Sequence, residues 1–485
     1  MPNVNDLIKI INQEKLNVDK DLVRLAYDFA AQAHKDGMRA SGDPYITHPL
    51  ITAMTLAKYH LDQETIIAGI LHDVPEDTER TQKDVEKEFG KEIGKLVEGI
   101  TKLGKLKYRG IERYTENLRK MFIAMAADLR VIFIKFADRL HNLKTLDALP
   151  KEKRERIALE TLEIYAPIAN RLGIWQLKGQ LEDYSFKNLY PKEYEDLKKI
   201  VEARFSEREI LLKDIRKKIS LELKKENINF LDISGRSKDL WSLYKKLQKN
   251  DNHIERVYDV IALRVVVETV ADCYKVLGII HGKWKPIPNR IKDYIAQPKP
   301  NGYQSLHTTV FCGRGKTVEI QIRTEKMHLT NEYGIAAHWH YDEKGAIKFD
   351  KDIQWVKDLT RLQREIKDNK QYLDSLKIDV FQNRIFVFTP KGDVIDLPED
   401  STPIDFAYHI HTEIGDKATA ARINNQIASL DTYLRSGDMV EIIIDKNRQS
   451  PNRDWLKFVK TRAARDKIKM KSKKSVWDAI KRFRK

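Results

Sequence analysis

Cysteine is almost absent from this chain of 485 residues, in which Cys273 and Cys312 are the only two. Two thiols are too few for a disulfide framework or for a zinc site built from cysteines. Long apolar runs are missing as well, because no window approaches the roughly 18 uninterrupted apolar residues of a membrane-spanning helix. The opening residues, MPNVNDLIKIINQEK, also lack the apolar core of a secretory signal. Together these absences predict a cytoplasmic protein without membrane contact.

Acidic residues are scarce at one end of the chain. Residues 456–485 hold 13 Lys and Arg against two Asp and Glu, a charge of +11, whereas the chain as a whole carries +16. Such a basic tail favours a phosphate backbone through release of counterions. A solvated helix that only keeps the protein soluble has the same composition, and charge by itself gives affinity without sequence preference. Nucleic acid is therefore the expected partner of the tail, and solvent is the alternative.

The chain is too long for one ordinary domain, and its hydrophobic pattern changes along its length. Apolar residues at three- and four-residue spacing predict successive helices over residues 1–200. From 201 to 343, helical patterns alternate with strand patterns such as VYDVIALRVVVE and KTVEIQIRT. A polar helical linker is expected at 344–378, a small β-rich unit at 379–446 and a basic helical tail at 447–485. The predicted fold class is therefore multidomain α+β.

Two imidazoles and two carboxylates in the helical part form a candidate metal site. They are His48 in YITHP, His72 and Asp73 in LHDVPEDT, and Asp138 in FADRLHNLKTL. This set of ligands suits Mn²⁺, Fe²⁺ or Zn²⁺ better than Ca²⁺ or a metal that seeks thiolates. On a six-coordinate ion, such a set leaves two positions for a water and a phosphate oxygen, as metal-assisted phosphoester hydrolysis requires.

Two further acids, Glu76 and Asp77, follow four residues after the His–Asp pair. They are candidates to position the attacking water or to carry its proton. Pro75 does not fit inside a regular helix without a kink, so both acids are expected just past a helix break. Farther along, the acid of FADRLHNLKTL shares one helix face with Asn142 and Thr145, which follow it at i+4 and i+7. That face would hold a metal through its acid and a base edge through its amide.

Taken singly, each of these residues is more often found on a surface or in a satisfied core, and His141 is assigned to that class. Taken together, the spacing of the histidines and acids resembles the HD phosphohydrolase superfamily. The segments AHKDGMRASGDPYITHPL, ILHDVPEDT and FADRLHNLKTL resemble more specifically the hydrolase domain of RelA/SpoT homologues. That resemblance implies Mn²⁺ at His48, His72, Asp73 and Asp138, catalysis by Glu76 and Asp77, and nucleotide contacts from Arg39, Asn142 and Thr145.

Two positions depart from the family pattern. The family commonly has lysine where this chain has Ala40, and valine where it has Pro75. Neither change replaces an implied metal ligand. A lysine at position 40 would strengthen binding of the nucleotide, and this chain has alanine there. Synthetase-only members have typically lost the His–Asp pair, which this chain keeps at His72 and Asp73. Hydrolysis is therefore expected.

The mixed part is rich in side chains that bind phosphate, with an aromatic residue and two acids among them. Phosphoryl-type transfer needs cations along the polyphosphate, a metal held by carboxylates, and a group that orients or deprotonates the attacking hydroxyl. A basic patch for RNA is the alternative, but acids in strands add nothing to a groove for a polyanion. Period two places Glu319, Gln321 and Arg323 on one strand face. The other candidates are Arg236, Lys238, Lys246, Asp259, Arg264, Arg290, Lys292, Lys299, Asn301, Tyr303 and His307.

The segments GRSK, YDVIALRVVV, KDYIAQPKPNGYQSLHTTV and EIQIRTEKMH closely resemble the RelA/SpoT synthetase domain, whose fold is nucleotidyltransferase-like. The implied reaction moves the β,γ-pyrophosphate of ATP to the 3′-hydroxyl of GDP or GTP and yields the alarmone (p)ppGpp. Glu319 resembles the base for that hydroxyl, with Gln321 close by, and Asp259 resembles the Mg²⁺ ligand. The other implied roles are an adenine sandwich by Arg236 and Arg264, guanine stacking by Tyr303 beside Asn301, and phosphate binding by Lys238, Lys246, Lys292, Lys299 and His307. The Arg-x-Lys-Asp segment at 290–293 has the form found in bifunctional members.

The segment NRIFVFTPKGDVIDLPEDSTPIDFAYHIHT resembles a TGS domain, a small β-grasp module. Threonyl-tRNA synthetases carry this module too, but the synthetase pattern upstream favours the RelA/SpoT context. In that family the module touches the acceptor end of deacylated tRNA, and His411 lies in the matching FAYHIHT motif, although a histidine in a turn is otherwise usually a surface residue. Long members continue into further modules, including an ACT domain, whereas this sequence stops at Lys485. Control by the ribosome is therefore left open.

The sequence is thus identified as a RelA/SpoT homologue that is short at its C-terminus. It combines an all-α HD-type hydrolase domain, a mixed α/β synthetase domain, a TGS domain and a basic helical tail. We expect a bifunctional enzyme of the stringent response whose two sites are coupled, because simultaneous turnover would only consume ATP. One alternative is a hydrolase whose synthetase site only regulates. The other is a tRNA- or ribosome-binding regulator, which predicts tight, salt-sensitive RNA binding and negligible turnover of ATP with GDP.

Overall fold

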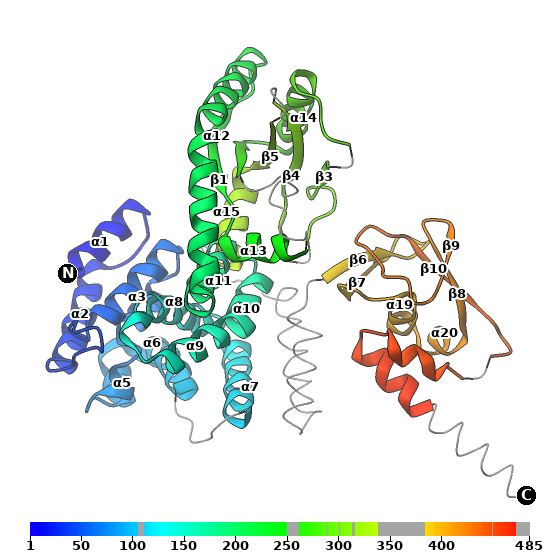
Figure 1. The fold of residues 1–485 in the computed structure, drawn as a ribbon. Coiled ribbons are helices and arrows are strands. Elements are labelled where there is room, and N and C mark those ends of the chain that lie inside the picture. The colour runs from blue at the N-terminus through cyan, green and yellow to red at the C-terminus, as the bar shows by residue number, and fades with distance from the viewer. Residues whose placement is uncertain are drawn as a thin grey trace, which may run out of the picture. The chain divides into compact units, whose positions relative to one another are not determined.

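A computed structural model describes residues 1–104, 111–249, 261–288, 290–299, 301–312, 316–337, 384–448 and 450–471. The chain divides into two compact units, Met1–Thr360 and Arg361–Lys485 (Figure 1). Helices fill the N-terminal part of the first unit and a mixed sheet follows, whereas the second unit is a small β-rich module. The expected multidomain α+β class is confirmed. The linker predicted at 344–378 lies outside the described residues.

The N-terminal helices form where amphipathic segments begin at polar caps. Asn3 and Asp6 close a capping box on the first helix, and Asp62 accepts a hydrogen bond from the backbone N–H of Thr65 in the fourth. Within the described ranges, no helix is both long and apolar enough to cross a bilayer. The helical half consists of α1 (Val4–Gln13), α2 (Lys20–Ala33), α3 (Thr47–Lys58), α4 (Gln63–Leu71), α5 (Val74–Asp77), α6 (Gln82–Gly104), α7 (Ile111–Ala127), α8 (Arg130–Lys144), η1 (Leu146–Ala148), α9 (Lys151–Glu160), η2 (Thr161–Tyr165), α10 (Ala166–Arg171) and α11 (Trp175–Leu189).

Close packing between α3 and α4 brings two histidine-bearing segments together. Gly69 of α4 lies so near α3 that a Cβ there would stand 2.5 Å from Leu56 Cδ1, so a side chain at this position would require the Leu56 side chain to move. Two residues separate α4 from the short helix α5, and Pro75 lies in the first turn of α5. Proline is tolerated there because its missing N–H would have no partner within the helix. The predicted helix break ahead of Glu76 and Asp77 is confirmed.

A five-stranded sheet organises the rest of the first unit, which we call the sheet half. Its strand order is β1-β2-β5-β4-β3, in which β2 and β5 pair in parallel and the other neighbours pair antiparallel. The elements of the sheet half are α12 (Pro191–Lys225), β1 (Phe230–Ser237), α13 (Leu240–Lys249), β2 (Ile261–Val267), α14 (Val270–Lys283), β3 (Lys292–Asp293), β4 (Leu306–Phe311), β5 (Thr317–Thr324), α15 (Glu325–Tyr333) and η4 (Gly334–Ala336).

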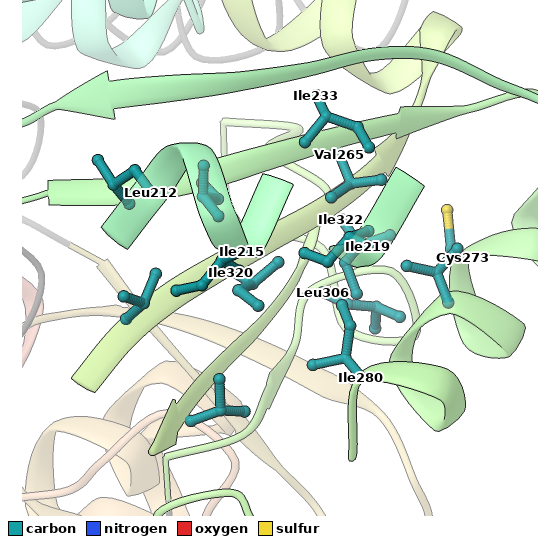
Figure 2. Close-up of a cluster of buried hydrophobic side chains, with 14 of the residues drawn as sticks. Leu212, Ile215, Ile219, Ile233, Val265, Cys273, Ile280, Leu306, Ile320 and Ile322 are labelled. Atoms are coloured by element: carbon teal, nitrogen blue, oxygen red, sulfur yellow. The ribbon is translucent and has the colours of Figure 1, made fainter. Parts of the chain in front are cut away.

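Alternation along β5 separates its apolar side chains from its polar ones, as the sequence predicts. Ile320 and Ile322 enter the core beneath α12 and α14, where Figure 2 shows Ile219 and Ile280 beside the strand. Full burial of such a side chain contributes about 1.5–3 kcal/mol. The opposite face of β5 carries Glu319 and its polar neighbours, although this face is covered too. The predicted alternation therefore marks a core face and a polar interior face rather than a solvated one.

Helices α11 and α15 join the two halves within the first unit. Asp183 of α11 accepts hydrogen bonds of 3.2 and 2.9 Å from the first two backbone N–H groups of α13. Gly334, with φ of 59°, lies against the turn before α11, where a Cβ would stand 2.3 Å from the carbonyl oxygen of Leu172. The N–H of Ile335 donates to that same carbonyl at 3.1 Å. Backbone contacts therefore dock the sheet half on the helical half.

The second unit contains a three-stranded sheet, ordered β10-β8-β9, and the hairpin β6–β7. An isolated parallel bridge between Phe388 and Met439 ties the hairpin to the start of β10. Strands β6, β7 and β10 cover RIFVF, VIDLP and VEIII, so the expected β-rich character of this part of the chain is confirmed. The elements are β6 (Arg384–Phe388), β7 (Val394–Pro398), α19 (Pro403–Ile410), α20 (Thr412–Lys417), β8 (Ala418–Ile423), β9 (Gln426–Ala428), β10 (Val440–Ile444) and η5 (Arg453–Lys457).

The first part of the basic tail packs against this module. Trp455, Val459 and Ile468 share one buried cluster with Tyr408 of α19. The fully buried Asp405 accepts hydrogen bonds from the backbone N–H groups of residues 460 and 461. Residues 453–471 therefore pack against the second unit through one apolar face and keep several charged side chains exposed, whereas 472–485 lie outside the described residues.

Candidate active sites

Two helices and one helix break bring the predicted metal ligands together. His48 lies in α3, Asp138 in α8, and His72 and Asp73 between α4 and α5. His48 Nε2 lies 3.3 Å from Asp138 Oδ1 and 3.5 Å from Asp73 Oδ2, and His72 Nε2 lies 3.1 Å from Asp73 Oδ1. Ligand atoms of His48, His72 and Asp138 all lie within 4.8 Å of one another. The helical half therefore contains a buried group that is able to hold a metal ion.

Hydrogen bonding determines which nitrogen of His72 faces this cluster. Its Nδ1 lies 2.8 Å from the carbonyl oxygen of Gly69 and must donate to it, because a carbonyl only accepts. In the neutral ring Nε2 then carries a lone pair, and this buried atom makes no hydrogen bond. A buried lone pair that faces carboxylates is unfavourable unless a cation lies between them. The donor set therefore fits a divalent metal.

His141, which the sequence assigns to a surface or a satisfied core, is buried against the predicted metal ligand His48. Its Nδ1 lies 2.7 Å from Nδ1 of His48, and the two rings stack with centroids 5.0 Å apart. His48 has to donate in this contact if its Nε2 is to keep a lone pair for a metal. Burial lowers the pKa of His48, and burial together with His48 lowers the pKa of His141 to about 3. Both rings are therefore neutral, as ligation requires.

Asp138 is held by two donors from its own helix. Lys135 Nζ lies 2.7 Å from its Oδ2, and Asn142 Nδ2 lies 2.5 Å from its Oδ1. Burial opposes ionisation, but Lys135, followed by His48, holds the pKa of Asp138 well below its ordinary value. The ligand is therefore ionised. Sequence reasoning missed Lys135, and its only signal was the spacing of three residues on one helix face.

A cavity of about 310 Å³ opens beside Asp138. The predicted nucleotide contacts Arg39, Asn142 and Thr145 line it together with Ala40. Arg39 donates to Asn142 Oδ1 at 2.8 Å and Asn142 donates to Asp138, so the amide that was predicted to read a base is engaged by protein on both sides. Cationic side chains in the lining make such a cavity suitable for binding phosphate. Three of these cations were not predicted from the sequence, namely Lys135, Arg139 and Lys153.

The two candidate catalytic acids lie at the rim of the cluster, where Glu76 and Asp77 are both exposed on α5. Asp77 Oδ2 lies 2.5 Å from the hydroxyl of Tyr45, which also lies 3.0 Å from Oδ2 of Asp73. Burial, followed by Asp73, raises the pKa of Tyr45, so the phenol stays protonated and donates. Sequence reasoning did not single out Tyr45, although it opens the quoted motif YITHP.

In the sheet half, a chain of hydrogen bonds ends at Glu319. Glu319 Oε1 accepts from Gln321 Nε2 at 2.9 Å and lies 3.3 Å from His307 Nδ1, and His307 Nε2 lies 2.8 Å from the hydroxyl of Tyr303. Burial lowers the pKa of His307 although Glu319 acts to raise it. In the neutral ring the proton on Nδ1 points at the carboxylate and Nε2 accepts from the phenol. The structure thus brings four of the predicted synthetase residues into one chain.

Lys299 lies in an aromatic cage to which the helical half contributes. Burial, followed by the charges of Lys292 and Lys246, lowers the pKa of Lys299 to about 8. The charges of these three predicted phosphate ligands, Lys246, Lys292 and Lys299, therefore lie close enough to repel one another. No sequence pattern singled out the part of the cage that comes from α11. The ring centroids that lie 4.6–5.6 Å from Lys299 Nζ belong to Tyr294, Tyr303 and Trp175.

Arg264, the predicted adenine contact, is engaged by an ion pair. Its Nη1 lies 2.9 Å from Glu332 Oε1, which also accepts from Arg323 Nη2 at 2.8 Å. A cavity of about 410 Å³ beside it is lined from both halves, by Trp175 and Asp183 of α11 as well as by Arg264 and Glu332. This volume lies in the range of sites for small molecules. Apart from its position shortly after EIQIRTEKMH, nothing in the sequence indicated that Glu332 would lie at this site.

The remaining predicted residues are less closely gathered. Asn301 donates from Nδ2 to the carbonyl oxygen of Asn170 in the helical half at 3.2 Å. His411 is exposed and caps α20, where its Nδ1 accepts from the N–H of Glu413 at 3.3 Å. Lys238 is half-buried just after β1, and Lys246, Lys292 and Arg290 are exposed. Asp259 and the side chain of Arg236 lie outside the described residues and stay predictions.

Three family models match the chain. The HD domain matches residues 26–175, the region found in RelA/SpoT proteins matches residues 235–346, and the TGS domain matches residues 385–444. Each match lies over one of the architectures described above: the helical half, the sheet half and the β-rich module.

Curated relatives match almost the whole chain. A probable guanosine-3′,5′-bis(diphosphate) 3′-pyrophosphohydrolase of Synechocystis is 46% identical over 96% of this chain and 62% of its own length. A guanosine-3′,5′-bis(diphosphate) 3′-pyrophosphohydrolase of Aquifex aeolicus is 46% identical over 97% of this chain and 67% of its own length. The bifunctional (p)ppGpp synthase/hydrolase SpoT of Escherichia coli is 46% identical over 92% of this chain and 64% of its own length. The chain thus spans about two thirds of these relatives, and it belongs to the RelA/SpoT family.

Proposed function

We propose that this chain is a bifunctional enzyme, which makes (p)ppGpp from ATP and GDP or GTP and hydrolyses it to GDP or GTP and pyrophosphate. The observation that carries the proposal is the buried Nε2 of His72, which makes no hydrogen bond and lies 3.1 Å from Asp73 Oδ1. With His48 and Asp138 this atom belongs to a group able to hold a metal, beside a cavity lined with cations. A family member that had lost hydrolysis would have no need of this cluster. The names of the Aquifex and E. coli relatives support the same two activities.

For hydrolysis, we infer that the four ligands hold Mn²⁺, the ion that the family resemblance implies. Such an ion supplies Lewis acidity toward a phosphate oxygen and lowers the pKa of a bound water. Asp77 would accept the proton of the attacking water, with Glu76 beside it. Arg39 and the cations of the adjoining cavity would neutralise the substrate's diphosphates, and Asn142 and Thr145 would contact its nucleoside.

For synthesis, Glu319 would accept the proton of the 3′-hydroxyl while Gln321 and His307 hold its carboxylate in place. Tyr303 would stack on guanine. Lys299 and the neighbouring lysines would follow the polyphosphate, since phosphoryl transfer depends on positioning and charge rather than on covalent chemistry. By the same resemblance, Asp259 would hold Mg²⁺, which would neutralise the charge that develops on the phosphates.

The second unit would supply the contact with a regulator. By the family resemblance, the TGS module would touch the acceptor end of deacylated tRNA near His411, and the basic tail would add salt-dependent affinity for RNA or the ribosome. An exposed histidine is compatible with this role.

Two parallel reactions test the proposal, one with ATP, GDP and Mg²⁺ and one with ppGpp and Mn²⁺, each followed by anion-exchange chromatography. We expect AMP and ppGpp in the first and GDP and pyrophosphate in the second. Glu319→Gln should abolish only the first activity, and Asp77→Asn should reduce only the second to a low residual rate, so each variant controls for the folding of the other. If ppGpp is hydrolysed in the second reaction but none is made in the first, the chain is a hydrolase without synthetase activity. No change in either reaction would favour a regulator that binds RNA.

A further inference from the structure

The hydroxyl of Tyr45 connects two acids with different roles in the hydrolase site. Its oxygen lies 3.0 Å from Oδ2 of Asp73 and 2.5 Å from Oδ2 of Asp77. Asp73 lies against both histidines of the metal-capable cluster, whereas Asp77 lies on the exposed turn of α5. One side chain therefore spans the distance from the buried cluster to the candidate base at its rim.

Packing holds the Tyr45 ring on several sides. The ring stacks on His34 with centroids 4.5 Å apart and an interplanar angle of 18°, and it meets His48 edge-on at 6.3 Å. The backbone N–H of Tyr45 donates to the carbonyl oxygen of Gly37 at 2.9 Å, and a Cβ at Gly37 would stand 3.1 Å from that of Tyr45. His34 is itself 7% exposed. The hydroxyl is therefore held by a rigid support, as precise positioning requires.

A phenol has one proton, so it donates fully to one carboxylate at a time. When Asp73 ligates a cation, its oxygen becomes the poorer acceptor, and the proton is left for Asp77. We propose that Tyr45 is a positioning residue for hydrolysis, which orients the Asp77 carboxylate toward the attacking water once the metal site is filled. This inference rests on the proposed hydrolase function and adds a residue to it.

Tyr45→Phe tests the proposal, because it keeps the ring on His34 and removes only the hydroxyl. With ppGpp and Mn²⁺ we expect kcat to fall by about tenfold or more and KM to stay within about twofold. Binding of Mn²⁺ to the chelated full-length protein, followed by electron paramagnetic resonance, should keep its stoichiometry. The double variant Tyr45→Phe/Asp77→Asn should be no slower than Asp77→Asn, because both changes remove the same contact.

Tyr408→Phe is the matched control. Its hydroxyl donates to a buried aspartate, Asp416, at 3.0 Å in the other unit, so its loss should leave ppGpp hydrolysis unchanged. A wild-type kcat in Tyr45→Phe, additive losses in the double variant, or loss of bound Mn²⁺ would each overturn the proposal. If Tyr45→Phe is unchanged while the wild type is active, only the role of Tyr45 fails. An inactive wild type would overturn the proposed hydrolase function and this inference with it.

Discussion

Trp175 of the helical half lies edge-on against Tyr303 of the sheet half, with ring centroids 5.6 Å apart and an interplanar angle of 65°. Tyr294 and His307 also contact Tyr303 edge-on, so that this residue is only 6% exposed. A ring that stacks on guanine has to offer one of its faces to the base. Access to the proposed guanine site therefore depends on where the helical half lies.

Trp175→Ala should lower the KM for GDP in synthesis by several-fold. The variant uncovers the ring of Tyr303, so less of the binding energy is spent on displacing the indole. Initial rates of AMP formation at a series of GDP concentrations measure the effect, with Trp175→Phe as an intermediate case. A raised KM would contradict this expectation and would mean that the indole itself binds the nucleotide.

Gly334→Ala should weaken the docking of α15 on the helical half. A Cβ there would stand 2.3 Å from a backbone oxygen of Leu172, and φ is 59°, so the substitution brings both a clash and backbone strain. We expect a loss of at least about 2 kcal/mol in the free energy of unfolding of the first unit. Gly278→Ala in α14, where a Cβ meets nothing within 4 Å, should instead stabilise by up to about 1 kcal/mol. Equal denaturation midpoints for the two variants would contradict the prediction.

Mn²⁺ should raise the thermal midpoint of metal-free protein. A ligand that binds only the folded state stabilises it, by about 2.7 kcal/mol at a hundred times its Kd. His72→Ala should remove most of this shift, because it deletes a buried and unpaired ligand atom. His281→Ala is the control, since its Nε2 lies 2.8 Å from Thr308 Oγ1, outside the cluster, and it should keep the full shift. A shift that persists in His72→Ala would mean that the ion binds elsewhere.

Local sequence was sufficient for the features that local chemistry determines. Pro75 predicts the helix break, and the alternation along β5 predicts which of its side chains lie on the face opposite the apolar core. The metal-capable cluster was also predictable, because its ligand types appear in short motifs.

The supporting residues were not predictable, because their partners lie far away in the chain. His141 meets His48 across 93 residues, and Trp175 reaches Tyr303 only because α15 docks on the helical half. The high charge of the tail likewise gave no indication that apolar residues such as Trp455 pack its first part against the second unit. Such contacts depend on tertiary packing, which neither periodicity nor composition records.

Asp183 should make the first unit less stable as the pH rises from about 4 to about 6. Burial raises the pKa of this carboxyl group from its ordinary 3.8 to about 6, with Asp239 adding to the effect. The folded state therefore binds the proton more tightly than the unfolded state does. The stabilising contribution is full below the unfolded pKa and is lost as the pH rises through the folded one.

Asp183→Asn isolates this effect, because its side chain does not ionise. Its single amide oxygen still accepts from one of the two N–H groups at the start of α13, and the loss of the other hydrogen bond is the same at every pH. Relative to the wild type, the variant should gain roughly 2 kcal/mol of unfolding free energy between pH 4.5 and pH 7. Urea denaturation of both proteins at the two pH values measures the gain. Asp84→Asn is the control, because the backbone N–H of Thr81 lowers the pKa of the exposed Asp84, so this carboxyl is ionised in both states at both pH values and the difference should not change. If the difference between Asp183→Asn and the wild type does not change with pH, Asp183 ionises alike in both states and folding does not raise the pKa of its carboxyl group.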